Sequence, residues 1–359
     1  MAEKQTKKTG SATQPSSATG RGRVTINDIA RLANVSKKTV SRVLNEHPTV
    51  SAETRARVKQ IMAEQGYVPD PQARALAFRR SFLIALAYDN PSPQYVVNMQ
   101  RGILDQLEGT DYQLVLHPVD RSAEGFVDKL EQFVERHRPA GVIMPPSVSE
   151  DEALCEMLKS QSCPYVRIAS LELDAPAHIV RTHDADGAAQ AARHLASLGH
   201  TRIAHIHGPK SFRSAHQRLA GFKEGLREFG LVLEDDLTIE AGYTFDSGVR
   251  AADNLLSRSN RPTAIFAGND EMAIGIFASA RKLGLSIPDD LSIVGFDDTP
   301  MASRIAPALT TVRLPIRDMG AEAARAVLKL ISGQEVTENQ SFNPEIIVRE
   351  STRALSATL

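Results

Sequence analysis

The sequence predicts a small all-α head followed by a large α/β core made of two lobes, each built on a parallel sheet. Three observations predict this arrangement. The chain has 359 residues, more than the roughly 250–300 at which a single hydrophobic core stops growing. Residues 24–67 show helical periodicity in short runs, whereas residues 82–296 alternate apolar strands with helices. The charge is also divided unequally between these two parts.

Residues 1–80 are basic, and the rest of the chain is acidic. The first 80 residues contain 15 Lys and Arg against 6 Asp and Glu, whereas the other 279 contain 27 against 37. Only three of the lysines lie in the first 20 residues, so the positive charge belongs mostly to the helical part and not to a basic tail. A basic domain on an acidic body predicts that the domain binds a polyanion.

The composition, 42% hydrophobic and 24% charged, is typical of a soluble globular protein. No run of 18 apolar residues is present, so we expect no membrane span. The amino terminus lacks the apolar core of a secretion signal, and the only cysteines are Cys155 and Cys163, so we expect a reducing, cytoplasmic location. Residues 1–22 are small and polar, and we expect a disordered tail there.

Three short helices are predicted in a head that spans residues 23–68. Their expected ranges are Thr25–Ala33, Ser36–Asn45 and Ser51–Gln65, and each begins at a Ser or Thr that can cap it. Only a tight turn at Asn34 fits between the first two helices, since asparagine tolerates the left-handed backbone conformation. Two helices joined in this way form a helix-turn-helix motif, whose second helix enters the major groove of DNA.

Three cationic side chains share one face of the second helix. Lys37, Lys38 and Arg42 project opposite the inward-facing Val40 and Val43. An arginine can bond two acceptors of a guanine edge, and a lysine can bind a base edge or a phosphate. Cations on a helix surface are often merely solvated, but the helix-turn-helix setting favours DNA contact here.

Small polar residues near the helix starts suit either phosphate oxygens or helix caps. We expect Thr25 and Ser36 to serve first as caps. Thr39 and Asn45 have no evident capping role, so they are candidate contacts to phosphates or bases.

Residues 69–80 are predicted to link the head to the core. Pro69 and Pro71 end the third helix, and the helix-capable segment Gln72–Arg80 is too short to be stable alone in water. We therefore expect it to become helical only on specific DNA. Leu76, its only large branched aliphatic residue, can either wedge between base steps from the minor groove or pack the paired linkers of a dimer, and both can hold together.

Residues 81–359 are predicted to form the α/β core. Lobe one is expected to span about 81–178 and 311–338, and lobe two about 179–310 and 339–356. Ligands of open parallel sheets bind beyond the carboxyl ends of the strands, so two facing sheets predict a cleft site. The expected strands are Phe82–Tyr88, Tyr112–Val119, Gly141–Met144, Tyr165–Ala169, Ile179–Thr182, Ile203–His207, Leu237–Ala241, Ala264–Ala267 and Leu291–Phe296. Helices are expected near 94–108, 124–137, 150–160, 185–198, 213–229, 246–257 and 270–283.

From Val24 to about Arg353 the chain resembles the LacI/GalR family of bacterial transcription regulators. The matching motifs are VTINDIARLANVS, TVSRVLN, VSAETRARV and GYVPD in the head, RALA in the linker, and HIHGP, RLAGF, AGNDEMAIG, SIVGFDD and PALTTV in the core. The resemblance implies a periplasmic-binding-protein-like core of two flavodoxin-like lobes. It implies a homodimer, most simply a repressor, that binds a pseudo-palindromic operator and carries a small-molecule effector in its cleft. It also implies that Lys37, Lys38 and Arg42 read bases and that Leu76 is the wedge.

The resemblance further assigns polar effector contacts in the core. Arg218 and Asp297 match the family's effector-binding arginine and aspartate, and we expect them on opposite sides of the cleft, together with Asn269. The alternative is that Arg218 and Asp297 form a structural ion pair. Asp270 and Asp298 are expected to serve as cap or turn residues. Three further side chains at strand ends are weaker candidates to line the cleft: Asp89, His183 and Asp184.

Aromatic positions of the family favour a carbohydrate as the effector. Tyr95 and Tyr243 stand where relatives place rings against the ligand, although plain packing is the alternative. Val96 replaces a second aromatic residue, and Phe212 stands where a purine-binding relative has an arginine. Both departures count against a flat purine base.

We predict no enzymatic activity, cofactor or metal. No phosphate-binding loop, zinc-protease, nucleophile-elbow or dinucleotide motif follows a strand. His205 and His207 share a strand face without a third ligand at metal spacing, and the two cysteines lack a basic activator. The alternatives are a two-lobed sugar-binding receptor without a DNA role, which should carry a secretion signal in place of the head, and a hydrolase, which needs a nucleophile beside a base.

Overall fold

The computed structural model describes residues 24–44, 48–67 and 81–355 and divides into two compact units, Met1–Phe78 and Arg79–Leu359. The expected disordered tail and linker lie outside the described residues, and so do two candidate DNA contacts, Asn45 and Leu76. In the described part of the chain, no helix is long and apolar enough to cross a lipid bilayer.

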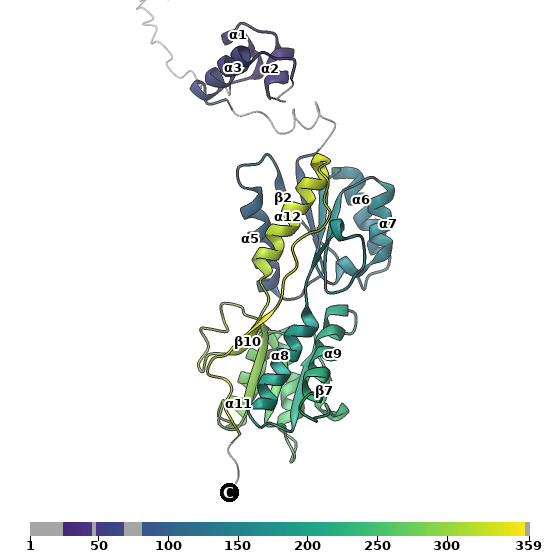
Figure 1. Cartoon of the computed structure of the whole chain (residues 1–359), viewed down its shortest axis with the longest axis vertical. Helices are drawn as coiled ribbons and strands as arrows, with labels where there is room; N and C mark the ends of the chain where they lie inside the picture. Colours follow the sequence, from purple (N-terminus) through teal and green to yellow (C-terminus); the bar gives the residue numbers. More distant parts are fainter. Residues whose placement is uncertain (1–23, 45–47, 68–80, 356–359) are drawn as a thin grey trace, which may run out of the picture. The chain divides into compact units, whose positions relative to one another are not determined.

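Within residues 24–44 and 48–67 the head forms three short helices, as the sequence predicts (Figure 1). They are α1 (Ile26–Leu32), α2 (Lys37–Leu44) and α3 (Ala52–Glu64). Each helix turns one apolar face inward, and together these faces form one small core. Its fully buried members are Ile29, Val40, Val43 and Val58.

Local signals fix where these helices begin and end. Thr25 and Asp28 form a capping box, in which the Asp28 N–H donates to Thr25 Oγ1 at 3.4 Å and the Thr25 N–H donates to the Asp28 carboxylate at 3.0 Å. Ser51 caps α3 by accepting from the Thr54 N–H at 3.3 Å. Asn34 has a φ of +50°, the left-handed conformation that the tight turn requires.

Lobe one is a five-stranded parallel sheet with helices on both faces. Its strands, in the spatial order β2-β1-β3-β4-β5, are paired in parallel throughout. Helices α5 and α12 cover one face and α6 and α7 the other (Figure 1). The elements are β1 (Leu83–Tyr88), α5 (Pro93–Leu107), β2 (Gln113–Pro118), α6 (Phe126–His137), β3 (Gly141–Met144), η1 (Val148–Glu150), α7 (Glu152–Ser160), β4 (Tyr165–Ala169), η2 (Pro176–His178), β5 (Ile179–Arg181) and α12 (Ile316–Ser332).

Lobe two is a six-stranded sheet in the order β11-β10-β9-β8-β6-β7, in which only β11 is antiparallel to its neighbour. Helices α8 and α9 pack on one face, and α10 and α11 pack on the other. The elements are α8 (Asp184–Ser197), β6 (Ile203–His207), α9 (Arg213–Arg227), η3 (Asp235–Leu237), β7 (Thr238–Glu240), α10 (Phe245–Leu256), β8 (Ala264–Ala267), α11 (Asp270–Lys282), β9 (Ser292–Asp297), β10 (Thr310–Arg313) and β11 (Glu345–Ile347).

Two of the predicted lobe boundaries are wrong. Residues 179–181 were expected to open lobe two, but they form β5, which pairs in parallel with β4 of lobe one. Residues from 311 were expected in lobe one, but β10 pairs with β9 of lobe two, and only α12 returns to lobe one. The chain therefore crosses between the lobes near Thr182, Leu314 and Phe342, where the Phe342 N–H donates to the Arg181 carbonyl at 2.9 Å.

Close contact between α5 and α12 explains how a distant segment joins lobe one. A Cβ on Gly102 would lie 1.8 Å from the carbonyl oxygen of Arg317, so only glycine allows the two helices to approach this closely. Gly320 of α12 makes the reciprocal approach to Met99 of α5. This packing holds α12 beside the first helix of the core and carries Met319 to the cleft.

Candidate functional site

Helix α2 presents its cations to solvent. Val40 and Val43 are fully buried in the head core, whereas Lys37, Lys38 and Arg42 are exposed on the other side of the helix. None of these three cations forms an ion pair with another residue in the described ranges 24–44, 48–67 and 81–355. These three side chains are therefore accessible to phosphates and base edges, as the helical pattern predicts.

The small polar residues at the helix starts act as caps. The Thr39 N–H donates to Ser36 Oγ at 3.0 Å, and the Thr39 hydroxyl lies 2.9 Å from the same oxygen. Thr39 is thus the residue that Ser36 caps, and its own hydroxyl bonds the Ser36 oxygen and not a backbone N–H. Thr25 is occupied by its capping box with Asp28. Each of these hydroxyls can still accept or donate one further bond.

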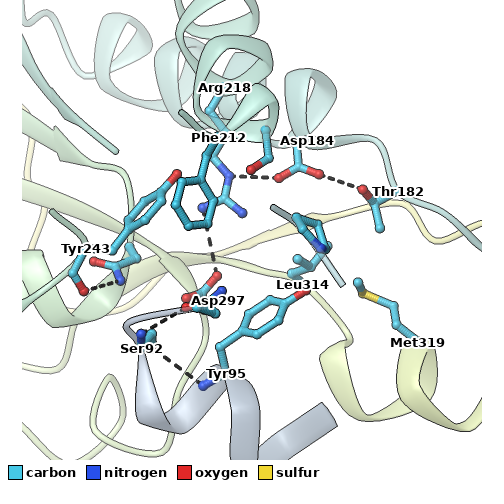
Figure 2. Close-up of a pocket in the computed structure, with 14 residues that line it drawn as sticks. Ser92, Tyr95, Thr182, Asp184, Phe212, Arg218, Tyr243, Asp297, Leu314 and Met319 are labelled. Carbon is cyan, nitrogen blue, oxygen red and sulfur yellow. Dashed lines mark hydrogen bonds and ion pairs between the residues drawn. The ribbon is translucent and has the colours of Figure 1, made fainter. Parts of the chain in front are cut away.

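All six core residues predicted to bind an effector line one pocket between the lobes (Figure 2). Lobe one contributes the carboxyl-end loop of β1, the start of α5 and the start of α12, and lobe two contributes the ends of its strands and helix α9. The free volume in the pocket is about 20 Å³, enough for about one water molecule. The lining residues are Asn90, Ser92, Tyr95, Pro146, Thr182, Asp184, Phe212, Ser214, Arg218, Tyr243, Asn269, Asp297, Leu314 and Met319.

Arg218 is the only cation that lines this pocket, and it is buried. Its Nε donates to Asp184 Oδ1 at 2.8 Å, and its Nη1 donates to the Gly268 carbonyl at 2.6 Å. The guanidinium also lies flat against Phe296, 3.7 Å from the ring centroid. Burial acts to lower the pKa of Arg218, but Asp184 and Asp297 outweigh it and raise that pKa above its ordinary value.

Asp297 is a carboxylate with an unmet hydrogen bond. It is 6% exposed, and its Oδ1 accepts no hydrogen bond from the residues that the structure describes. Arg218 Nη1 is 4.0 Å from this oxygen, an ion pair that is too long for a hydrogen bond. Burial raises the pKa of Asp297 well above its usual range, and Arg218 offsets part of that rise. The backbone φ of +107° is strained for a residue other than glycine.

The expected placement of Arg218 and Asp297 on opposite sides of the cleft is wrong. Helix α9, which carries Arg218, and strand β9, which ends in Asp297, both belong to lobe two. The true partner of Arg218 is Asp184, the first residue of α8 and one of the weaker candidates from the sequence. Asp184 is in turn fixed by the Thr182 hydroxyl, which donates to Oδ2 at 2.6 Å. Its position at a strand end did not separate it from Asp89 and His183, which share that signal and do not line the pocket.

Aromatic rings form one wall of the pocket. Phe212 meets the edge of Tyr243 at 5.5 Å between centroids and 81° between planes, and burial raises the pKa of Tyr243 to about 12. The Asn269 amide donates to the Tyr243 carbonyl at 3.0 Å, while its oxygen caps α11. Asn269 therefore positions Tyr243 as well as lining the pocket. Tyr95 faces these groups from α5 of lobe one (Figure 2).

The other predicted acidic residues have structural partners. Asp270 accepts hydrogen bonds from the Thr299 N–H and the Thr311 hydroxyl, both at 2.6 Å. Asp298 forms ion pairs with Arg313 and Arg349. As expected, neither aspartate lines the pocket, and neither do two of the weaker candidates, Asp89 and His183.

Metal and thiol chemistry find no support in the described ranges 24–44, 48–67 and 81–355. No group of three His, Cys, Asp or Glu side chains there could hold a metal ion. Burial raises the pKa of the Cys155 and Cys163 thiols to about 11, which disfavours the reactive thiolate. The pocket is suited to binding a polar molecule through its carboxylates, arginine and aromatic rings.

Comparison with known sequences identifies both units. Residues 25–70 match the family described as bacterial regulatory proteins, lacI family, and residues 192–352 match the periplasmic binding protein-like domain. The chain is 34% identical to the HTH-type transcriptional regulator DegA of Bacillus subtilis, over 93% of this chain and 99% of that protein. It is 34% identical to catabolite control protein A of Priestia megaterium, over 92% and 99% respectively.

Solved structures extend the likeness to the whole fold. The Lac repressor dimer bound to operator and the anti-inducer ONPF has a TM-score of 0.78 and 29% identity, with 93% of this chain and 100% of that chain covered. The CelR–cellobiose complex has a TM-score of 0.69 and 30% identity, with coverage of 92% and 100%. These matches confirm the predicted helix-turn-helix head and two-lobed core.

Proposed function

Because this chain belongs to the LacI family of bacterial regulatory proteins, and is thus a DNA-binding transcription regulator, we propose that it is a repressor controlled by a carbohydrate in the pocket. The observation that carries the proposal is the pocket itself, in which a buried arginine, two carboxylates and aromatic rings converge between the lobes. The match of residues 25–70 to the lacI family favours this function over a sugar receptor without a DNA role.

The head supplies the proposed DNA contacts. Arg42 is expected to bond a guanine edge, with Lys37 and Lys38 on neighbouring bases or phosphates. Thr25, Ser36, Thr39 and Asn45 are proposed phosphate or base contacts, and the caps leave the hydroxyls of the first three one bond to spare. Two heads of a homodimer would read the half-sites of a pseudo-palindromic operator. Since operator DNA is the partner, we place the regulator in the cytoplasm.

The linker is proposed from the sequence alone. Leu76 would enter the minor groove between central base steps, while the paired linkers of the dimer become helical. A change in the spacing of the two linkers would then melt them and release the heads, so that affinity falls to the salt-sensitive, non-specific level. Loss of specific affinity in Leu76→Ala, with unchanged binding of random DNA, supports this role.

Charge in the pocket favours a neutral ligand. Asp184 already accepts a hydrogen bond from the Arg218 guanidinium at 2.8 Å. Asp297 is therefore the second carboxylate beside a single cation, and its Oδ1 lacks a hydrogen-bond donor among the described residues. A hydroxyl-rich sugar supplies such donors, whereas a sugar acid or phosphate would add another anion to the two carboxylates already buried there. The Arg218–Asp297 pair and the aromatic wall thus suit a neutral carbohydrate such as the cellobiose bound by CelR.

A thermal-shift screen of the full chain tests this function. Matched sets of neutral sugars, uronic acids, sugar phosphates and nucleosides should yield a shift with a neutral sugar, because a ligand at 100 times its dissociation constant adds about 2.7 kcal/mol. The same sugar should change the affinity for operator DNA, and Asp297→Ala should abolish both effects. A shift confined to nucleosides or acids would contradict the proposal.

A further inference from the structure

The two lobes also contact each other at the rim of the pocket. Only about 20 Å³ is free inside the pocket in this structure, a narrow state that we call closed, and the rim contacts accompany this state. Two lobe-one residues make these contacts, Arg121 after the carboxyl end of β2 and Glu150 after that of β3, and Asp89, which follows β1, lies beside them. None of the three lines the pocket.

Helix α9 of lobe two begins without a cap of its own. Its N-cap residue is Phe212, which offers no side-chain acceptor, and its first turn holds no acidic residue. The first N–H groups of a helix need partners, and the positive end of the helix dipole favours an anion there. This end matters because α9 carries Ser214 and Arg218 into the pocket.

Glu150 of lobe one provides the missing cap. It is 6% exposed, and its Oε2 accepts from the Arg213 N–H at 3.0 Å. Burial raises the pKa of Glu150, and the Arg213 and Ser214 N–H groups offset part of that rise. A residue of one lobe therefore caps the helix of the other lobe that presents the pocket arginine.

Arg121 makes a second contact beside this cap. Its Nη1 donates to the Ser211 carbonyl, one residue before the N-cap, at 3.2 Å. In lobe one, the Asp89 carboxylate accepts from the Ser147 hydroxyl at 3.4 Å, and burial raises the pKa of Asp89 while the charge and the backbone N–H of Arg121 offset part of that rise. Arg121 is thereby anchored in lobe one while its guanidinium reaches lobe two.

We infer that Glu150 and Arg121 form an interlobe clasp that positions α9 and favours the closed pocket before any ligand binds. Separating the lobes would leave the first N–H groups of α9, the Ser211 carbonyl and the Glu150 carboxylate without these partners. Each lost bond disfavours the open state. The clasp therefore links the distance between the lobes to the position of Arg218, and this link does not depend on which ligand the pocket takes.

Spin-label distance measurements on the full chain, without ligand or DNA, test the clasp. The exposed residues Asp128 of α6 and Arg250 of α10 are changed to cysteine and labelled. Labelled chains are then mixed with a tenfold excess of unlabelled chain, so that nearly every dimer that carries labels holds a single labelled copy. The native cysteines are buried and stay protonated, since burial raises their pKa to about 11. The parent protein should show one dominant short distance.

Glu150→Ala should raise the ratio of long to short distances about five- to tenfold, the factor expected for a lost helix cap. Glu150→Gln keeps an acceptor oxygen and should restore most of the short-distance population, a rescue that general destabilisation would not produce. Arg121→Ala should act in the same direction. Glu156→Ala is the control, because this exposed glutamate pairs only within α7, with Lys159.

Unchanged distances in both Glu150→Ala and Arg121→Ala would overturn the inference, as would a parent protein that is mainly open. If Glu150→Ala does not fold, Arg121→Ala and Glu150→Gln decide the matter. Because neither sugar nor operator is present, this outcome is independent of the proposed function.

Discussion

Helices α2 and α9 both carry cations proposed to meet a partner, but they hold them in opposite ways. On α2, Lys37, Lys38 and Arg42 are exposed and form no ion pair within the described part of the chain. On α9, Arg218 is buried and already bonded to Asp184 and to the Gly268 carbonyl. Exposed cations keep their charge for a polyanion, and salt screens them. A buried, paired arginine has little net charge left to attract an anion, so it selects a ligand by geometry.

Removal of the buried cation should have the largest effect. Arg218→Ala leaves Asp184 and Asp297 without their shared cation, and breaking a buried pair in this way costs about 3–5 kcal/mol. We expect that loss in the free energy of unfolding of the core, measured by urea denaturation, together with loss of the sugar response.

The control for this comparison lies on the same helix. Arg227 is exposed and pairs with Glu224 three residues earlier, so Arg227→Ala should leave the stability close to that of the parent. Equal effects of the two substitutions would show that burial does not distinguish them.

Buried histidines should make the core sensitive to acid. His205 is fully buried and packs against Phe222 and Phe266, and burial lowers its pKa to about 3. The unfolded chain binds this proton below about pH 6.5, whereas the folded chain does not. Stability is therefore complete above pH 6.5 and falls as the pH drops towards 3, by up to about 3 kcal/mol between pH 6.5 and 4.

His205→Phe isolates this contribution, since it keeps the stacking and removes the titrating group. The variant loses the bond from Nδ1 to the Phe266 carbonyl at all pH values, but its urea-denaturation stability should decline less steeply below pH 6.5 than that of the parent. If stability declines equally with pH in the two proteins, the acid sensitivity comes from other groups. Burial also lowers the pKa of three further histidines, His194, His200 and His207.

The helices, the strands and the pocket residues could be predicted from the sequence. Which strands pair with one another, and which side chains, could not. Caps and periodicity are local, so Thr25, Ser51 and the turn at Asn34 followed from neighbouring residues. Strand pairing is not local, so nothing near residues 179–181 or 310–313 tells which sheet they join. The same limit hid the pairing of Arg218 with Asp184, which are 34 residues apart and meet only because α8 packs against α9.

The exposed cations should show their effect in DNA binding and not in stability. Arg42→Ala is expected to weaken specific operator binding by about 1–3 kcal/mol, because a two-pronged contact to a guanine edge contributes about that much. Anisotropy titrations at several fixed salt concentrations would measure it. Arg31→Ala, which removes an exposed arginine of α1, is the matched control. An equal loss on random DNA would make Arg42 a phosphate contact.

The smallest expected effect separates capping from DNA contact in the head. Thr25→Ala removes one half of the capping box with Asp28 and should lower the stability of the head by about 1 kcal/mol. Thr25→Ser keeps the hydroxyl and should restore the stability. If Thr25 is only a cap, operator binding of the alanine variant should return to the parent level at temperatures where the head is fully folded. If it also holds a phosphate, a loss shared by operator and random DNA should persist at those temperatures. Calorimetric melting of the head beside binding titrations at two temperatures would distinguish the two roles.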